Sequence, residues 1–304
     1  MSRPTGFTVP PLDGKTALVT GSNAGLGFEA AKLLARNGAR VLLACRNATK
    51  AEAAAEQIRA VASAPVEVVS VDLANLASIA AGAGAVLDGE DRLDLLINNA
   101  GLMAIDEART DDGFEMQIGV NHLGHFALTA RLAPLVLATP GSRIVTMSSI
   151  GHRAGRLRLD DLFFERRRYD RWQPYFQSKL ANLLFTAELH RRLTRAGSST
   201  LALAAHPGTS RTDLGYEGGG ITNKLMKPVA PFLQPAAAGA LPLVRAATDP
   251  HAAGGQFYGP RWMARGRPVV ETPSRRARNA DDARRLWERS EQLTDLTFEI
   301  PPSA

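Results

Sequence analysis

The stretch TALVTGSNAGLG, residues 16–27, decides the fold: a short apolar run leads into a glycine-rich turn and then directly into an alanine-rich stretch. Glycines at three positions allow a tight turn and leave backbone amides and a helix amino end open to a pyrophosphate. A glycine pattern alone also fits a purely structural turn. Its place between the first strand and the first helix favours a dinucleotide cradle instead. The predicted contacts are Gly21, Ser22, Asn23, Gly25, Leu26 and Gly27.

The same alternation continues along most of the chain. Short apolar runs alternate with alanine-rich helical stretches, which is typical of a parallel sheet with right-handed crossovers. We therefore predict an α/β protein with one domain over residues 1–304, a Rossmann fold with a seven-stranded parallel sheet flanked by helices. The predicted strands are Thr16–Thr20, Arg40–Ala44, Val66–Val71, Leu93–Ile97, Arg143–Met147, Thr200–Ala204 and Gln256–Tyr258, and the predicted crossover helices are Gly27–Asn37, Ala48–Ala62, Leu76–Leu87, Gly113–Leu137 and Tyr175–Ala196.

Two later segments depart from this alternation. Residues 215–235 contain three consecutive glycines followed by an amphipathic run, Ile221–Phe232. A mobile substrate loop and a plain surface excursion are equal alternatives for this segment. Residues 279–293 are rich in charge and predict a C-terminal helix.

Composition limits the class of protein. With 304 residues and 45% apolar content, the chain can bury a large core. A single cysteine, Cys45, excludes an intrachain disulfide and agrees with a reducing compartment. No run approaches the roughly 18 to 20 apolar residues of a membrane span, and the N-terminus lacks a signal-peptide core. We expect a cytoplasmic protein without a membrane span.

The formal charge of +6 invites a nucleic-acid interpretation. Only six of the 36 cationic residues are lysine, so arginine dominates, which a compositional bias of the genome explains equally well. The densest basic runs, Arg166–Arg168 and Arg275–Arg276, carry no interleaved aromatic residues. Solvated faces are the better interpretation, and no nucleic-acid partner is expected.

Tyr175 and Lys179 are four residues apart in a predicted helix, so their side chains share one face. A phenol with a pKa near 10 needs roughly 4 kcal/mol of extra phenolate stabilisation to work near pH 7. A nearby ammonium can supply much of it. Taken alone, this spacing fits a surface helix pair as well as a proton-transfer site. The pair Ser148–Ser149, which follows an apolar run upstream, adds a hydroxyl.

The second predicted strand ends in ACRN, residues 44–47. NAD-binding proteins normally carry an acid here, which holds the ribose 2′-hydroxyl. No carboxylate is present, and Arg46 is placed to receive a 2′-phosphate. The sequence therefore favours NADP over NAD, with a solvated strand-end Arg46 as the alternative.

With the glycine turn, NNAG at residues 98–101, Ser149 and the Tyr175/Lys179 pair in order, the chain resembles the short-chain dehydrogenase/reductase family over roughly residues 14–260. The resemblance implies that Tyr175 is the general acid or base and that Lys179 lowers its pKa and holds the nicotinamide ribose. Ser149, rather than Ser148, would steady the substrate oxygen. Asn121 would anchor a water leading protons toward the lysine.

The resemblance also implies further cofactor contacts. Asp72 and Leu73 match the pair beside the adenine, and Asn99 and Ala100 match the turn under its ribose. Pro207 and Gly208 match a Pro-Gly turn of the family. The threonine that follows this turn, here Thr212, would contact the nicotinamide carboxamide.

The spacing from Ser149 to Tyr175, 26 positions, is about twice that of the commonest family members, which places an insertion at about residues 153–172. Similar lengthening, with ACRN and the YxxSKLAN pattern, is found in the retinol-dehydrogenase-like and protochlorophyllide-reductase-like branch. Those relatives act on bulky apolar substrates. Three aromatic residues of the insertion are expected to anchor it on the core rather than line a pocket: Phe163, Phe164 and Trp172.

The predicted function is an NADP-dependent oxidoreductase that interconverts a carbonyl and an alcohol. The alternative is a non-catalytic NADP(H) sensor or scaffold on the same fold. His122, His125 and His152 lack cysteine or carboxylate partners at zinc-site spacing, so no metal is expected. Relatives often pair through the helices corresponding to residues 113–137 and 175–196, which suggests a homodimer or homotetramer unless the insertion covers that surface.

Overall fold

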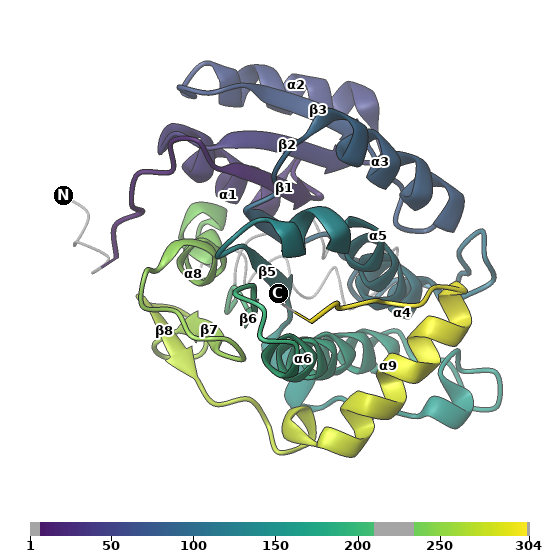
Figure 1. The fold of residues 1–304 in the computed structure, drawn as a ribbon. Coiled ribbons are helices and arrows are strands. Elements are labelled where there is room, and N and C mark those ends of the chain that lie inside the picture. Colours follow the sequence, from purple (N-terminus) through teal and green to yellow (C-terminus); the bar gives the residue numbers. More distant parts are fainter. Residues whose placement is uncertain (1–6, 210–233, 303–304) are drawn as a thin grey trace.

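A single sheet of eight strands forms the centre of the protein, in the order β3-β2-β1-β4-β5-β6-β7-β8 (Figure 1). The computed structural model describes residues 7–209 and 234–302 of the chain. Neighbouring strands are parallel except for β8, which is antiparallel to β7. The strands are β1 (Thr16–Thr20), β2 (Arg40–Cys45), β3 (Val66–Ser70), β4 (Leu95–Asn98), β5 (Arg143–Met147), β6 (Leu201–Ala205), β7 (Phe257–Pro260) and β8 (Pro268–Glu271).

The predicted α/β Rossmann fold is confirmed, but the prediction of seven parallel strands is wrong by one strand. The additional strand, β8, returns beside β7 through a hairpin, so no crossover helix marks it in the sequence. The strand order reverses direction at the β1–β4 boundary. Ligands of such sheets bind beyond the carboxyl ends of the strands at this switch point.

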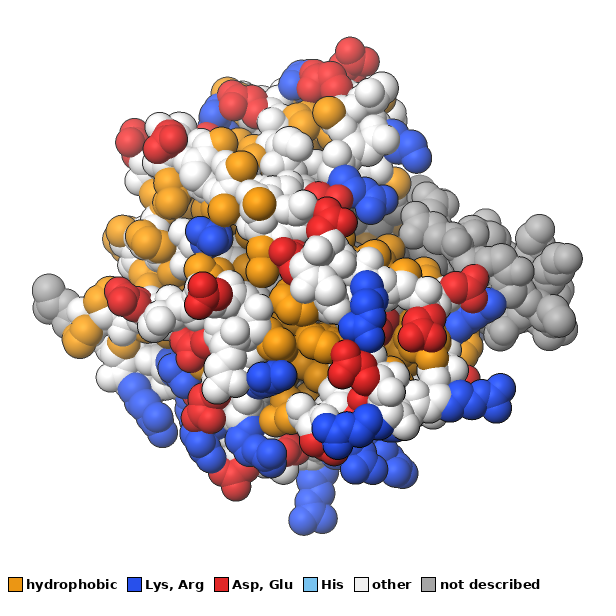
Figure 2. All heavy atoms as spheres, turned by 90° about the vertical axis from the view of Figure 1, so that its right-hand side faces the viewer, with side chains coloured by type: hydrophobic (Ala, Val, Ile, Leu, Met, Phe, Trp, Pro, Cys, Tyr) orange, Lys and Arg blue, Asp and Glu red, His pale blue; other side chains and the backbone are white. Residues whose placement is uncertain are grey.

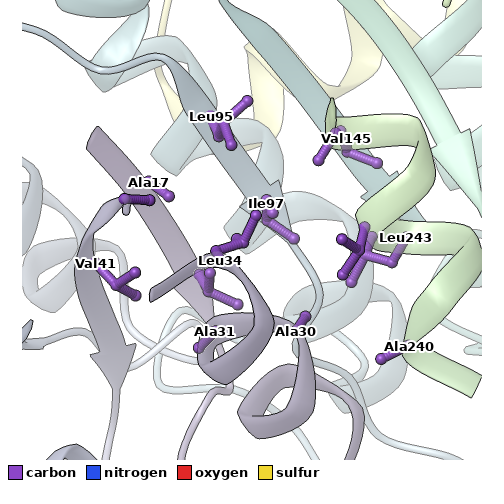
Figure 3. Packing of buried hydrophobic residues seen from close by; sticks show 14 of the residues in the cluster. Ala17, Ala30, Ala31, Leu34, Val41, Leu95, Ile97, Val145, Ala240 and Leu243 are labelled. Carbon is purple, nitrogen blue, oxygen red and sulfur yellow. The ribbon is translucent and has the colours of Figure 1, made fainter. Parts of the chain in front are cut away.

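Helices cover both faces of the sheet. One face packs against α1 (Gly25–Arg36), α2 (Ala48–Arg59) and α8 (Ala236–Thr248), the last of which was not among the predicted helices. Figure 3 shows this layer, with Leu34 of α1 and Leu243 of α8 beside side chains of the strands. The other face packs against α3 (Leu76–Gly89), α5 (Gly124–Ala138) and α6 (Trp172–Arg195).

The long helix predicted at residues 113–137 is divided in the structure. A short α4 (Met116–Ile118) continues into a π-helical turn, Gly119–Leu123, and then into α5. π-Helical turns are rare and occur often at functional sites. Asn121 lies inside this turn.

The C-terminal helix α9 (Ala280–Thr294) lies along α6 (Figure 1). Its Trp287 is 1% exposed and packs edge-on against Phe126 of α5 at 5.2 Å between ring centroids. The same ring stacks on Phe185 of α6 at 5.8 Å, and Arg192 lies over it. The two helices expected to pair between chains therefore bury part of their surface under α9 of their own chain.

The insertion between Ser149 and α6 is held by specific contacts. Phe164 is 4% exposed and Phe163 stacks on Phe114 at 5.5 Å between ring centroids, so these two residues anchor the insertion as predicted. Trp172 instead begins α6 and stacks on Phe176, with its ring 6.3 Å from that of Tyr175.

The charge of the surface is mixed on the face turned toward the viewer in Figure 2. Acidic and basic side chains lie interspersed around hydrophobic atoms, without a large area of one sign. Among the helices of the described residues, none is both long and apolar enough to cross a bilayer.

Candidate functional site

A cavity lies at the carboxyl ends of the central strands, at the switch point of the sheet. Its walls come from the glycine-rich turn, the ends of β2 and β4, the chain after β5, and α6. Thirteen of the predicted residues line it: Gly21, Asn23, Gly25, Leu26, Gly27, Arg46, Asp72, Leu73, Asn99, Ala100, Tyr175, Lys179 and Pro207.

The glycine turn is shaped by close backbone approaches. A side chain at Gly27 would meet the Gly21 carbonyl oxygen and Asn99 Nδ2 within 3.0 Å, and Gly21 has φ +63°. Asn99 Nδ2 itself donates to Thr20 O at 2.9 Å, which fixes the turn against the end of β4. The N-cap of α1, Ala24, contributes no side-chain hydrogen bond, and the first turn of this helix has no acidic residue. The helix amino end is therefore available to an anion, and the cradle fits a dinucleotide pyrophosphate.

Two predicted cofactor residues do not line the cavity, and a third is not described by the structure. The Ser22 hydroxyl is fully buried and donates to Val19 O at 2.8 Å, so its side chain does not face the cavity. Gly208 is not part of the cavity wall, because its backbone at φ +68° lies against Ala264. Thr212, together with the predicted substrate loop up to residue 233, lies outside the described residues.

The adenine-ribose end of the cavity is more basic than predicted. The Arg46 side chain is 73% exposed, with Nε 4.0 Å from Asp72 Oδ2. Lys50 lines the same wall, as does Asn47, whose side chain accepts from Lys50 N at 2.9 Å and caps α2. The sequence carried a signal for Lys50, because it follows Arg46 by four residues at the start of a predicted helix. Other wall residues gave no such signal: Cys45, Val71, Gly101, Leu102, Val120 and Met147.

The structure brings Tyr175, Lys179 and Ser149 together. Tyr175 is hydrogen-bonded with the Ser149 side chain, and Lys179 Nζ lies 5.8 Å from the centroid of the Tyr175 ring. The neighbouring Ser148 hydroxyl donates to Lys179 O at 2.7 Å and is thereby occupied. Of the two serines, Ser149 is the one beside the phenol, although it does not line the cavity.

Burial is the largest cause of the pKa shifts of Tyr175 and Lys179. It raises the pKa of Tyr175, and the hydrogen bond with Ser149 opposes this. Burial also lowers the pKa of Lys179 to about 8. Ser149 is the group that lowers the pKa of the phenol in this structure. The expectation that Lys179 also lowers it stays a prediction. Near pH 7 the phenol is protonated and the ammonium remains largely charged.

Lys179 has donor capacity to spare. Among the described residues its Nζ makes one long hydrogen bond, 3.4 Å to Met147 O, although an ammonium has three protons to donate. A side chain at Gly101 would lie 3.2 Å from this nitrogen, so glycine keeps the approach to it open. The buried ammonium therefore fits a hydroxyl-bearing ligand such as a ribose.

Asn121 ties the site together but does not line the cavity. Its Oδ1 accepts from Leu102 N at 2.7 Å, and its Nδ2 donates to Leu102 O at 3.0 Å and to Ser178 Oγ at 2.8 Å. The side chain thus joins the loop after β4 to α6.

The described residues contain no group of three or more potential metal-ligating side chains. Burial lowers the pKa of His122 to about 3 and those of His125 and His152 to about 4. These three rings are neutral at physiological pH.

Comparisons with known proteins agree with this geometry. The family model described as short chain dehydrogenase matches residues 15–217. Human retinol dehydrogenase 13 is 41% identical over 304 residues, covering 96% of this chain and 87% of the relative. Human retinol dehydrogenase 12 is 39% identical, covering 95% and 89%.

Solved structures give the same picture. The crystal structure of an uncharacterized protein from Mycobacterium Paratuberculosis has a TM-score of 0.82 and 46% identity, covering 96% of this chain and 97% of that one. A short chain dehydrogenase from Escherichia coli, complexed with NADPH, has a TM-score of 0.65 and 25% identity, covering 82% and 97%. The chain therefore belongs to the short-chain dehydrogenase family of oxidoreductases, in its retinol-dehydrogenase-like branch.

Proposed function

We propose that this protein is an NADP-dependent oxidoreductase that interconverts a carbonyl and an alcohol on a bulky apolar substrate, with Tyr175 as general acid and base. The observation that carries the proposal is the arrangement of Tyr175, Ser149 and Lys179 beside a dinucleotide cradle. A phenol, a hydroxyl and a buried ammonium are the groups that carbonyl reduction requires.

In the reducing direction, Tyr175 donates its proton to the carbonyl oxygen. The Ser149 hydroxyl donates a hydrogen bond to the same oxygen and positions it against the phenol. Lys179 holds the ribose and stabilises the phenolate that remains. NADPH, held by the glycine turn and by Lys179, would supply the hydride. In the oxidising direction the Tyr175 phenolate is the base.

The preference for NADP rests on Arg46 and Lys50. Both are cationic side chains on the wall of the cavity beyond β2, where a 2′-phosphate would lie. The NADPH complex of the Escherichia coli relative supports the same cofactor.

The proposal of an apolar substrate rests on the names of the similar proteins. Two curated relatives that align with about 95% of this chain are named retinol dehydrogenases, so retinal and long-chain aldehydes are the first candidates. Trp172, at the end of the insertion, lies with its ring 6.3 Å from that of Tyr175, so the insertion approaches the phenol.

The test is turnover of NADPH, followed by its absorbance, with retinal, decanal and the polar control glyceraldehyde. We expect turnover of the apolar aldehydes, and a loss of about 100-fold or more in kcat for Tyr175→Phe with unchanged NADPH affinity. Equal turnover by Tyr175→Phe would refute the assigned acid. Preference for glyceraldehyde would refute the apolar substrate.

The second candidate is a protein that senses NADP(H) or scaffolds a partner. It predicts NADPH binding without turnover of any aldehyde or ketone, in the wild type and in Tyr175→Phe alike. The hydrogen-bonded phenol beside a buried ammonium favours the enzyme, since a binding protein has no need of it.

We also propose a cytoplasmic location and, as one assembly, a homodimer. Fractionation of cells and the mass of the purified protein in solution test the two. A variant that ends at residue 278 lacks the Trp287 cover over Phe126 and Phe185, and association only in that variant would show that α9 prevents pairing.

A further inference from the structure

His152 connects the segment after β5 to the segment after β8. Its ring is 1% exposed, and Nδ1 lies 2.7 Å from Ser149 O. On its other side, Nε2 accepts from the backbone N–H of Ser274 at 3.2 Å. Because Nε2 is an acceptor, the proton of the neutral ring is on Nδ1, which donates it to the carbonyl of Ser149.

His206 makes the opposite arrangement at the end of β6. It is also 1% exposed, and its Nδ1 accepts from the backbone N–H of Gly208 at 3.2 Å, across the Pro207 turn. The ring proton is therefore on Nε2. That nitrogen lies 3.2 Å from Glu271 Oε1 of β8, although the approach falls short of hydrogen-bond geometry.

Both rings pack on one side chain of β7. The Phe257 ring lies 5.5 Å from that of His152, edge to face, and 5.1 Å from that of His206. Gly259, also on β7, lets Glu271 reach His206, because a side chain there would meet both His206 Nε2 and Glu271 Oε1 within 3.0 Å. The β7–β8 hairpin thus contacts both histidines.

We propose that His152 and His206 are paired positioning residues, held in opposite neutral tautomers on Phe257, which fix Ser149 and the Pro207–Gly208 turn relative to the β7–β8 hairpin. His152 acts on the side of the site where the substrate oxygen would bind. His206 acts on the turn at the nicotinamide end of the cavity. Neither ring touches the reacting atoms, and the kinetic part of this inference rests on the proposed function.

The tautomers can be tested without any substrate. Ring nitrogens that carry a proton differ in chemical shift from those that do not, so a two-bond ¹⁵N–¹H spectrum of the protein, assigned with His152→Asn and His206→Asn, identifies each tautomer. We expect Nδ1–H for His152 and Nε2–H for His206. The reverse tautomer, or a charged ring, in either residue at pH 7.5 would overturn the proposal whether or not the protein is an enzyme.

The kinetic test uses variants that separate hydrogen bonding from volume. His152→Asn retains a donor for Ser149 O, whereas His152→Leu retains the apolar bulk alone. If the position of Ser149 depends on its hydrogen bond with His152, we expect His152→Leu to lower kcat for the best aldehyde about 10-fold to 100-fold. His152→Asn should recover most of the lost kcat. NADPH affinity stays unchanged in both. A purely packing role predicts that Leu is the better replacement.

His206 gives the complementary result. His206→Leu should weaken NADPH binding about 10-fold by nicotinamide fluorescence, whereas His206→Asn, which keeps an acceptor for Gly208 N, should bind nearly as wild type. His251→Gln, at an exposed histidine outside these contacts, serves as the control. Equal binding by both His206 variants would show that the ring does not position the turn. If no aldehyde is turned over by the wild type, the spectra and NADPH titrations still decide the proposal.

Discussion

The cofactor end of the cavity and the insertion before α6 are built by different means. At the cofactor end, Gly21 and Gly27 leave room for backbone approaches that a side chain would block, and Asn99 ties two strand ends together. The insertion depends on side chains instead: Tyr169 donates to Glu115 Oε1 at 3.1 Å, and Asp161 accepts from Arg167 Nε at 2.8 Å.

The cradle meets a requirement of the fold, binding of a dinucleotide, whereas the insertion can adapt to the requirements of a particular substrate. A pyrophosphate is the same in every dinucleotide, so a backbone cradle suits any member of the family. Substrates differ, and side-chain contacts in an insertion can change without disturbing the sheet. Substitutions at the cofactor end should therefore alter cofactor binding, and those in the insertion should alter substrate binding.

The largest effect is expected at Lys179, which lines the cavity from α6, the helix that follows the insertion. Burial lowers its pKa from 10.5 to about 8, so the charged form is less stable in the fold by roughly 3 kcal/mol. The folded protein releases this proton near pH 8 and the unfolded chain retains it to about 10.5. Stability of the wild type should therefore rise between these values.

Lys179→Met removes this charge. Urea unfolding followed by tryptophan fluorescence, without cofactor, should show that the variant is more stable at pH 7 by up to roughly 3 kcal/mol, while it loses turnover. The difference should shrink toward pH 10.5. A variant that is less stable than the wild type at pH 7 would contradict the assigned burial of charge.

The sequence predicted the cofactor end of the cavity better than it predicted the contacts of the insertion. The glycine turn and NNAG have short, local spacing, and thirteen predicted residues line one cavity. A turn motif does not say which side chains face inward, and the structure shows that the Ser22 hydroxyl turns to Val19 O. Contacts between residues far apart in the sequence could not be predicted from it. The contact of Glu271 with His206 is one of them. The hairpin strand β8 and helix α8 also fell outside the predicted alternation.

At the cofactor end, Gly27→Ala tests whether the cradle depends on backbone approach. Its new methyl group would collide with Gly21 O and Asn99 Nδ2, so the variant should lose about 2 kcal/mol of stability and bind NADPH at least 10-fold more weakly. Gly84→Ala is the matched control, because a side chain at this position in α3 meets nothing within 4 Å. It should stabilise the protein by up to about 1 kcal/mol. Equal effects of the two substitutions would show that the turn tolerates a side chain.

Arg46→Ala tests a part of the cofactor end that depends on charged side chains rather than on backbone. Loss of a charged contact to the 2′-phosphate is expected to weaken NADPH binding about 10-fold and to leave NADH binding unchanged. Lys50→Ala should act in the same sense to a smaller extent. Titrations of nicotinamide fluorescence with NADPH and with NADH measure the two affinities. If a variant lost affinity equally for both dinucleotides, the replaced cation would not contact the 2′-phosphate.

The smallest effect is expected in the insertion, from Tyr169→Phe. The hydroxyl of Tyr169 donates to Glu115 Oε1 and accepts from Gln117 Nε2, both at 3.1 Å, so its loss leaves the buried Glu115 with one donor fewer. We expect about 1 kcal/mol less stability, faster hydrogen exchange over residues 159–170, and a KM for the aldehyde raised a few-fold.

NADPH affinity should not change in Tyr169→Phe, because none of these contacts reaches the glycine turn. Tyr258→Phe provides the control, since the Tyr258 hydroxyl donates to Gln256 and does not contact the insertion. If Tyr169→Phe weakened NADPH binding as much as it raised the KM for the aldehyde, the insertion and the cofactor end of the cavity would be coupled through α4. The division between a shared backbone cradle and a separately variable substrate end would then be wrong.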